Sequence, residues 1–361
     1  MTPFSPEITF ADHAYQSYLQ GLKQQWKHAV YDQVAVDAAR SAARTAPELE
    51  GDLRERSSAY RLYGWLERHL QQFKYVGRHG MLPVMERQAG ALTAALDAAA
   101  RRHPERLQLD PGLQLPAYFT VSDFHQHPGG IWSDDVDAFA YEWAANAFSF
   151  SMIAADAPYR WLAGYLADRF APESVIDLGC GFGKLCIPFK QKRPETRVTG
   201  VDLAAPLLRL AHLRSLEAGL DIEWVQANAE RVPRGAGSYA GILSYWLFHE
   251  LPPEAARHVL GEAFRLARPG GFFASLDMYT APGGLRGEFL HLGHAARNNE
   301  PYLPAMMASD PCEAMRAAGF VEVELIESMT AKPITHASHA GEALASTRTH
   351  VFSVAIGRKP A

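Results

Sequence analysis

The stretch VIDLGCGFGK, residues 175–184, decides the fold of this chain. Its apolar start, with Ser174 before it, predicts a short buried strand, and a helix is expected to begin near its end. Gly179, Gly181 and Gly183 lie between the two elements. Glycine at such positions lets the backbone approach a ligand closely and adopt a positive φ. The stretch therefore predicts a strand, a ligand-binding turn and a helix in succession.

Strands and helices alternate beyond this turn. Further strands are expected at residues 196–203, 222–228, 239–246 and 271–279, and helices at 207–219 and 253–267. Such alternation predicts a parallel sheet with helices on both faces. A helix at 310–319 then precedes two strands, at 320–327 and 349–357. We therefore expect an α/β fold whose mostly parallel, seven-stranded sheet ends in an antiparallel hairpin.

The amino-terminal part of the chain has a different pattern. Apolar residues recur at helical spacing, with helices expected at 15–34, 52–73 and 84–102 among four or so. We expect an all-α amino-terminal domain at residues 1–112, acting as a lid or a dimer surface. Residues 113–157, rich in aromatic, histidine and aspartate residues, are expected to connect it to a ligand-binding domain at 158–361, with an insertion for the substrate at 278–309.

Composition and charge narrow the class of partner. The 361 residues are 48% hydrophobic and carry a formal net charge of -5, with no basic stripe to bind a phosphate backbone. Nucleic acid is therefore not expected as a partner. No basic segment followed by an apolar one opens the sequence, and no stretch is long and apolar enough to span a membrane, so we expect a cytoplasmic protein. The three cysteines form no Cys-x-x-Cys pair, which suits a reducing compartment.

The glycine turn, together with later motifs, resembles the class I, Rossmann-like S-adenosylmethionine-dependent methyltransferases. The resemblance covers residues 158–357 and includes GVDLAAP, SYWLFHELPPE and ARPGGFFASLD in the family's order. It implies S-adenosylmethionine as cofactor and S-adenosylhomocysteine as product. It also implies that Asp202 bonds the ribose hydroxyls, that Leu203 packs on adenine and that Asn228 and Ala229 contact adenine, although Asn228 departs from the usual aspartate. The expected cofactor site comprises Asp177, Gly179, Cys180, Gly181, Gly183, Asp202, Leu203, Asn228, Ala229 and Tyr245.

Candidate catalytic residues are polar side chains expected near the carboxyl ends of the strands, where open α/β sheets bind ligands. Methyl transfer from a sulfonium is a direct displacement, so an enzyme mainly aligns the acceptor and, where needed, removes a proton. His249 follows a strand and is either a general base or a residue that holds the loop; Glu250 is either a partner in catalysis or a structural charge at a helix start. His125 and His127 are either a shared ligand pair or part of a polar turn.

Residues that would contact the substrate come from two segments and from the end of a strand. The expected substrate-binding residues are Tyr141, Trp143, Trp246, His291, His294, Asn298, Asn299 and Tyr302. No metal is assigned, but an alternative remains among the 15 histidines. His249 and Glu250, joined by His291 or His294, could hold iron or zinc and a chelating substrate. Histidines three apart, here and at 336 and 339, are otherwise typical of a solvated helix face.

We expect the protein to methylate an O, N or C atom of a small-molecule metabolite. The first alternative is a protein or RNA acceptor. The lack of a basic groove argues against RNA, and Tyr245-Trp246 does not belong to an amide-methylating tetrapeptide, which argues against a protein. The second is a non-catalytic scaffold that binds S-adenosylmethionine and recruits a partner through its helices. A homodimer is compatible with each of these functions.

Overall fold

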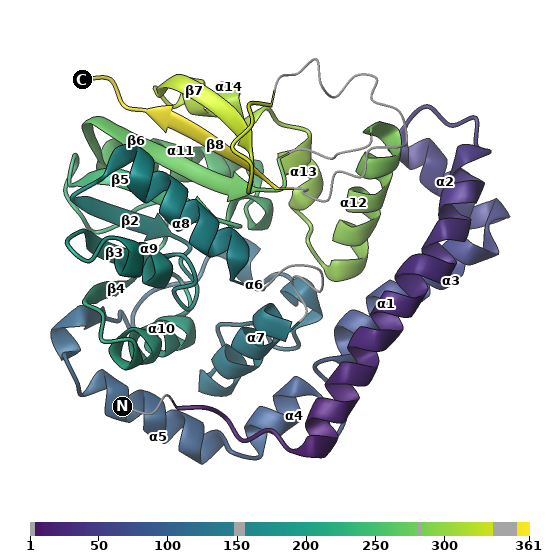
Figure 1. The fold of residues 1–361 in the computed structure, drawn as a ribbon, viewed down its shortest axis with the longest axis horizontal. Coiled ribbons are helices and arrows are strands. Elements are labelled where there is room, and N and C mark those ends of the chain that lie inside the picture. The colour runs from purple at the N-terminus through teal and green to yellow at the C-terminus, as the bar shows by residue number, and fades with distance from the viewer. Residues whose placement is uncertain (1–3, 148–155, 280–283, 335–351) are drawn as a thin grey trace.

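The structure is a computed structural model that describes residues 4–147, 156–279, 284–334 and 352–361. It consists of a central sheet flanked by helices, with the long amino-terminal helix α1 (Phe10–Ala39) running along one side of the molecule (Figure 1). The histidines at 336 and 339 and parts of the expected connecting segment and insertion lie outside the described residues.

The sheet is built around the predicted strand before the glycine turn. Its order is β1-β4-β3-β2-β5-β6-β8-β7 among the described residues. The strands are β1 (Leu107–Gln108), β2 (Ser174–Leu178), β3 (Arg197–Asp202), β4 (Ile222–Gln226), β5 (Tyr239–Tyr245), β6 (Ala267–Asp277), β7 (Val321–Glu327) and β8 (Ser353–Arg358). Strands β1 to β6 pair in parallel, whereas β8 runs antiparallel to both β6 and β7. The predicted α/β class and antiparallel end are thus confirmed.

The expected count of seven strands is wrong by one, because β1 adds an eighth strand beside β4. Leu107 and Gln108 pair in parallel with Trp224 and Val225. Two residues are too few to show the alternation of apolar and polar side chains by which a strand is recognised in a sequence. The pairing also brings the end of the amino-terminal helical region onto the edge of the sheet.

Helices cover both faces of the sheet. On one face, α8 (Ala157–Phe170) and α9 (Cys186–Lys192) bury residues such as Leu162 and Phe189 against the strands. On the other, α11 (Pro253–Leu266) and α14 (Pro311–Ala317) bury Val259 and Met315. Because β2 and β5 are buried along their whole length, they form the centre of this layered core.

The amino-terminal region is helical, as predicted. Its helices after α1 are α2 (Ala46–Arg56), α3 (Ser58–Phe73), α4 (Met81–Glu86) and α5 (Ala89–Ala100). The single helix expected at 52–73 is divided, because Ser57 adopts an extended backbone conformation (φ -105°, ψ 109°). Its hydroxyl accepts a hydrogen bond from the amide of Tyr60 at 3.0 Å, so Ser57 caps α3. A cap inside an apolar pattern of helical spacing was not anticipated.

One hydrophobic cluster joins the amino-terminal helices to the sheet region. It combines Met85 of α4, Leu92 of α5 and Phe139 of α7 (Asp135–Ala147) with Leu207 and Leu210 of α10 (Ala205–Glu217). The two parts of the chain thus share buried apolar surface, which stabilises their association. The expected domain boundaries at residues 112 and 157 stay a prediction.

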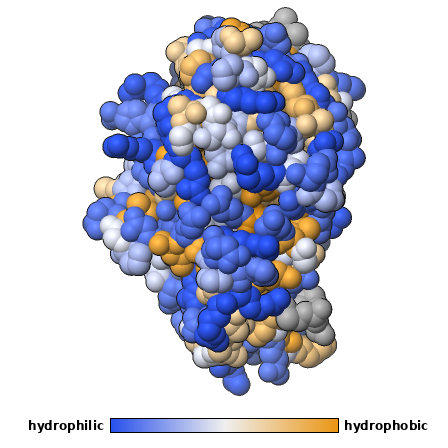
Figure 2. Space-filling view, turned by 90° about the vertical axis from the view of Figure 1, so that its left-hand side faces the viewer, coloured by the Kyte–Doolittle hydropathy of each residue, from blue (hydrophilic) through white to orange (hydrophobic). Residues whose placement is uncertain are grey.

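The surface is mixed in character. The face shown in Figure 2 is mainly hydrophilic, with smaller hydrophobic groups near its middle. Apolar atoms make up about half of most protein surfaces, so such groups are ordinary. No helix within the described residues combines the length and the apolar character that a membrane span requires.

Glu67 of α3 anchors helix α12 (Gly284–Asn298), which lies in the expected insertion. His294 Nδ1 lies 2.9 Å from Glu67 Oε1, and Arg297 Nε donates to Glu67 Oε2. Burial alone would raise the pKa of Glu67, but His294 and Arg297 outweigh it and lower that pKa from 4.5 to about 2. The carboxylate is therefore ionised at neutral pH and ties α12 to α3.

The indole of Trp224 is fully buried under two glycines. An ideal Cβ on Gly200 of β3 would lie 2.5 Å from Trp224 Cζ3, and one on Gly183 would lie 2.6 Å from Trp224 Cη2. The indole Nε1 donates to Ser215 Oγ at 3.2 Å, which holds the ring in place. Glycine at both positions is thus a packing requirement of Trp224.

We expect Gly200→Ala to lower the free energy of unfolding by about 1–3 kcal/mol, because the added methyl overlaps the indole. Urea unfolding should show that Gly200→Ala lowers the free energy of unfolding by less when Trp224→Phe is also present. Gly261→Ala, at an exposed position of α11 with no atom near its ideal Cβ, is the matched control. It should be neutral or stabilise the protein by up to about 1 kcal/mol. An equal Gly200→Ala penalty in both backgrounds would contradict the packing argument.

We expect Glu67→Gln to cost about 2 kcal/mol at pH 6, because it removes one partner of a partly buried ion pair. A carboxyl with a lowered folded-state pKa stabilises the protein above its unfolded pKa of 4.5 and loses that effect as pH falls toward 2. The raised pKa of His294, which Glu67 causes against the opposing effect of burial, adds stability below 6.5 that is lost as pH rises.

Urea unfolding of wild type and Glu67→Gln between pH 7 and pH 3.5 measures this difference. It should shrink at the acid end of the range. Glu50→Gln, which breaks the exposed Glu50–Arg54 pair, serves as the control and should cost less than about 1 kcal/mol. A Glu67→Gln penalty that does not change with pH would rule out the ionic tie.

Candidate active site

A cavity of about 380 Å³ lies at the carboxyl ends of the central strands. Its wall includes residues at or just after the ends of β2 to β6, which is where open parallel sheets bind ligands. Lys23 of α1, Gln71 of α3 and Tyr141 of α7 line the same cavity from the other side. The amino-terminal helices and the sheet therefore enclose a single site.

Most of the residues expected from the sequence line this cavity. On the side of the glycine turn these are Asp177, Gly179, Cys180, Gly181, Asp202, Leu203, Asn228, Ala229 and Tyr245. Elsewhere in the cavity wall they are His125, Tyr141, Trp246, His249, Glu250, His294 and Asn298. The cavity thus has a half near the glycine turn, here called the turn half, and a half that contains the histidines, here called the histidine half.

Asp202 is placed in the turn half by the end of β3. Its Oδ2 accepts a hydrogen bond from the Gly181 amide at 2.8 Å, and its Oδ1 accepts one from the Ala204 amide at 2.9 Å. Burial raises the pKa of Asp202, and these backbone donors oppose that effect. The carboxylate is held beside the turn, with lone pairs able to accept from two neighbouring hydroxyls.

The rest of the turn half provides room and a further acceptor. An ideal Cβ on Gly181, whose φ is 54°, would meet no atom within 4 Å, so the turn faces open space there. Asp177 is buried beneath the turn, and its Oδ1 has no hydrogen-bond partner. Burial raises the pKa of Asp177 to about 7. A ligand with a cationic group would satisfy this oxygen, so these residues fit S-adenosylmethionine.

Asn228 and Tyr245 complete the turn half. Asn228 Oδ1 accepts from the Glu230 amide at 2.9 Å and its Nδ2 donates to Glu230 Oε1 at 3.1 Å, which fixes the amide at the end of β4. The ring of Tyr245 stacks on Tyr159 with centroids 3.9 Å apart. Both side chains are therefore held in one orientation at the cavity wall.

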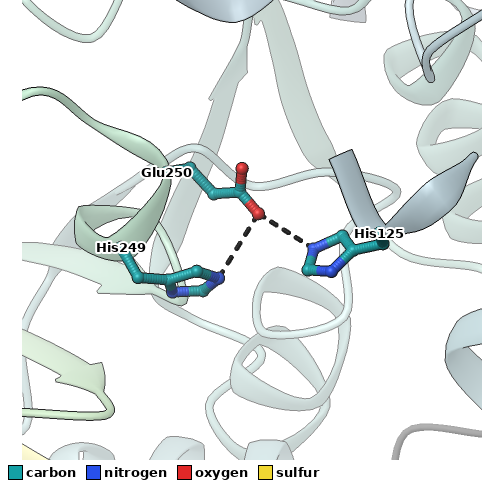
Figure 3. A group of neighbouring side chains, drawn as sticks. All are labelled: His125, His249 and Glu250. Atoms are coloured by element: carbon teal, nitrogen blue, oxygen red, sulfur yellow. Dashed lines mark ion pairs between the residues drawn. The ribbon is translucent and has the colours of Figure 1, made fainter. Parts of the chain in front are cut away.

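Three side chains meet in the histidine half. His125 comes from the single-turn helix Phe124–Gln126, and His249 and Glu250 come from the single-turn helix Phe248–Glu250 after β5. Glu250 Oε1 lies 2.9 Å from His125 Nε2 and 3.3 Å from His249 Nε2 (Figure 3). His125 has a φ of 54°, a backbone conformation that is costly for a residue with a side chain and is often found at functional sites.

A second carboxylate lies behind each histidine. His249 Nδ1 lies 2.8 Å from Oδ1 of Asp277, a fully buried residue at the end of β6. His125 Nδ1 lies 3.0 Å from Oε1 of Glu300, which is also buried. Both imidazoles are therefore held through Nδ1, and both present Nε2 to Glu250.

These carboxylates control the protonation of the cluster. Burial would lower the pKa of His125, but Glu250 and Glu300 outweigh it and raise that pKa to about 9. Burial would also lower the pKa of His249, but the neighbouring Asp277 carboxylate outweighs burial and raises that pKa. Burial would raise the pKa of Glu250, but the two histidines lower it to about 2. The surrounding carboxylates thus favour the protonated form of both imidazoles.

The remaining expected residues point elsewhere. His127 is buried with its Nε2 3.1 Å from Asp137 Oδ1, and Trp143 packs against the cluster shared by α5, α7 and α10. His291 Nδ1 lies 2.7 Å from its own helix at the Gly287 carbonyl. Gly183 packs on Trp224, Asn299 Nδ2 donates to the Asp123 carbonyl at 3.1 Å, and Tyr302 Oη lies 3.5 Å from the Tyr118 carbonyl.

Several residues of the site were not anticipated. Asp277, which lies behind His249, is near the end of a predicted strand next to the one that precedes His249, and this position alone could have indicated it. Lys23 and Gln71 lie on helices whose sequence pattern shows only amphipathic character, and Lys74 directly follows α3, so no local signal marks them. Their role depends on how the helices pack.

Comparisons with known proteins agree with the geometry. Residues 175–271 match the family described as "Methyltransferase domain". A demethylmenaquinone methyltransferase of Thermus thermophilus is 30% identical over 133 residues, which are 37% of this chain and 60% of that protein. A ubiquinone biosynthesis O-methyltransferase of Erwinia tasmaniensis is 33% identical over 120 residues, 32% of this chain and 47% of that protein. The chain thus spans about half the length of these curated relatives.

Solved structures also match part of the chain at low identity. One is Phospholethanolamine N-methyltransferase 2 of Haemonchus contortus in complex with phosphomonomethylethanolamine and S-adenosylhomocysteine, with 16% identity and a TM-score of 0.44 over 63% of this chain and 58% of that one. The family match covers the glycine turn, Asp202, Asn228 and the His249–Glu250 segment. Residues 175–271 of this chain are therefore similar to a methyltransferase domain.

Proposed function

We propose that this protein transfers the methyl group of S-adenosylmethionine to a small molecule bound in the histidine half of the cavity. The observation that carries the proposal is the continuity of the cavity. One space of about 380 Å³ joins the glycine turn to the cluster of His125, His249 and Glu250. Such a volume lies within the range of small-molecule sites, about 300–1,000 Å³.

The residues of the turn half fit the parts of the cofactor. When bound, S-adenosylmethionine supplies an electrophilic methyl group on a sulfonium. Asp202 would accept from the two ribose hydroxyls, and Asp177 would accept from the ammonium group of the methionine part. Asn228 and Ala229 would contact adenine at the end of β4. Each assignment uses a side chain that lines the cavity and is held by its own hydrogen bonds or packing.

Aromatic side chains from outside the sheet line the cavity. They are Tyr118, Phe119, Phe124, Trp132 and Tyr141, and all belong to the segment expected to connect the two regions. An apolar wall excludes water and strengthens the polar interactions inside the site. It also suits a small organic acceptor better than a peptide or an RNA, which would need an open groove. The names of the curated quinone-biosynthesis relatives agree with a small-molecule acceptor.

The amino-terminal helices would act as the lid of this site. Lys23, Gln71 and Lys74 bring α1 and α3 to the cavity, and Glu67 ties α3 to α12. An acceptor is thus surrounded by the sheet, the insertion and the helical region together. The homodimer, the cytoplasmic location and the absence of a nucleic-acid partner stay predictions.

We expect the purified protein to bind S-adenosylmethionine and S-adenosylhomocysteine with micromolar affinity in a calorimetric titration. Asp202→Ala should weaken both at least tenfold, about 1.4 kcal/mol, because the ribose hydroxyls lose their acceptor. Asp32→Ala, on the exposed part of α1, is the control and should bind like wild type. Absence of binding by the wild-type protein would refute the proposed function. Binding without methyl transfer to any of a broad panel of small molecules would instead favour the scaffold alternative.

A further inference from the structure

We propose that His125, His249 and Glu250 form a binding site for a divalent transition-metal ion. Each offers one ligand atom, and these three atoms lie within 4.8 Å of one another. All three side chains line the cavity and point toward a common centre (Figure 3). Two imidazoles and one carboxylate are a ligand set typical of iron(II) and zinc sites, whereas magnesium and calcium prefer oxygen ligands.

The separations between the ligand atoms suit an ion of this kind. Metal–ligand bonds of about 2.1 Å place neighbouring ligands about 3.0 Å apart in octahedral and about 3.4 Å apart in tetrahedral geometry. Here Glu250 Oε1 lies 2.9 Å from His125 Nε2 and 3.3 Å from His249 Nε2. An ion could therefore be accommodated with small movements of the side chains.

The carboxylates behind the histidines are an independent reason for a metal site. A histidine that binds a metal usually donates its other ring N–H to a carboxylate, which fixes the ring and its tautomer. Asp277 Oδ1 is placed to accept from His249 Nδ1 at 2.8 Å, and Glu300 Oε1 is placed to accept from His125 Nδ1 at 3.0 Å. A catalytic acid–base pair needs one such carboxylate on one histidine. Two histidines held in the same way, with both Nε2 atoms turned to one carboxylate, are better explained by a shared ion.

The site also has a further polar atom close to it. Glu300 Oε2 is buried and has no hydrogen-bond partner, although the other oxygen of the same carboxylate faces His125. Glu300 lines the cavity, so this oxygen can receive a hydrogen bond from a ligand or from water on the ion. The three protein ligands leave coordination positions free for an acceptor in the cavity.

The proposed ion suggests the class of acceptor, and this part rests on the proposed function. An acceptor with hydroxyl groups on adjacent carbons, such as a catechol, could bind the ion through both oxygens. Coordination lowers the pKa of a hydroxyl, whose proton then leaves to water. The oxygen lone pair forms the new O–C bond to the methyl group as the S–C bond breaks. Its electron pair stays on sulfur, which gives neutral S-adenosylhomocysteine.

Metal titration of the whole chain tests the site without using activity. Protein dialysed against a chelator would be titrated with zinc(II) by calorimetry and with cobalt(II) by visible absorption. We expect one ion per chain with micromolar or tighter affinity. His125→Asn and Glu250→Gln should each weaken binding at least 100-fold, and Asp277→Asn should weaken it about 10- to 100-fold through the position of His249.

Control variants separate this site from histidines elsewhere and from misfolding. His258→Asn removes an exposed histidine that also faces a carboxylate, Glu230 at 2.7 Å, and should leave the zinc affinity unchanged. Retained S-adenosylmethionine binding would show that the variants are folded. No stoichiometric binding by wild type, or equal binding by wild type, His125→Asn and Glu250→Gln, would overturn the proposal and leave the cluster as ion pairs.

The two proposals can fail separately. Zinc binding without S-adenosylmethionine binding would refute the proposed function and support the metal site. S-adenosylmethionine binding without zinc binding would refute the metal site and support the proposed function. For the acceptor class, methyl transfer to catechol and to phenol would be compared with one equivalent of zinc(II) or iron(II). We expect transfer to catechol only, abolished by a chelator. Equal transfer to phenol, or transfer to catechol that a chelator does not affect, would contradict chelation by the acceptor.

Discussion

The packing of one indole beneath the glycine turn is the constraint on which the rest of the structure depends. Trp224 fills the space left by Gly200 of β3 and Gly183 of the turn, and it is anchored by Ser215. Because a dense core tolerates little change in volume, this arrangement sets the distance between β3, β4 and the turn. The position of Asp202, whose carboxylate accepts from the Gly181 amide, follows from that distance. The packing of Trp224 in the core therefore also determines the geometry of the ligand-binding turn.

Much of the fold could be predicted from local patterns. The buried strand β2, the glycine turn and the alternation after them suffice for the parallel sheet, because each element is recognisable from its own residues. The errors occurred where long-range pairing or a single cap decides the structure. Strand β1 exists only because β4 offers an edge to Leu107 and Gln108, and the break between α2 and α3 depends on the backbone of Ser57.

The residues of the site also divide into those that local motifs predict and those that only long-range packing brings together. The residues of the turn half are close in sequence to strands and could be read from motifs, as with Asp202 after β3. The histidine half is assembled from distant segments. His125 and His249 were both singled out, but their meeting through Glu250 was not, since a turn 124 residues upstream of His249 has no sequence signal for that contact. Asp277 and Glu300 became meaningful only when their distances to the imidazoles were known.

The division of the cavity between chain segments has an evolutionary consequence. The stretch that matches the methyltransferase family, residues 175–271, contains the turn half but lacks His125, Asp277 and Glu300. Cofactor recognition can therefore be inherited as a unit, while the helical region and the insertion diverge under separate selection. Two proteins of this kind could share nearly all their recognisable motifs and still act on unrelated acceptors. Relationships drawn from the shared stretch would then follow the ancestry of the cofactor site and not that of the substrate.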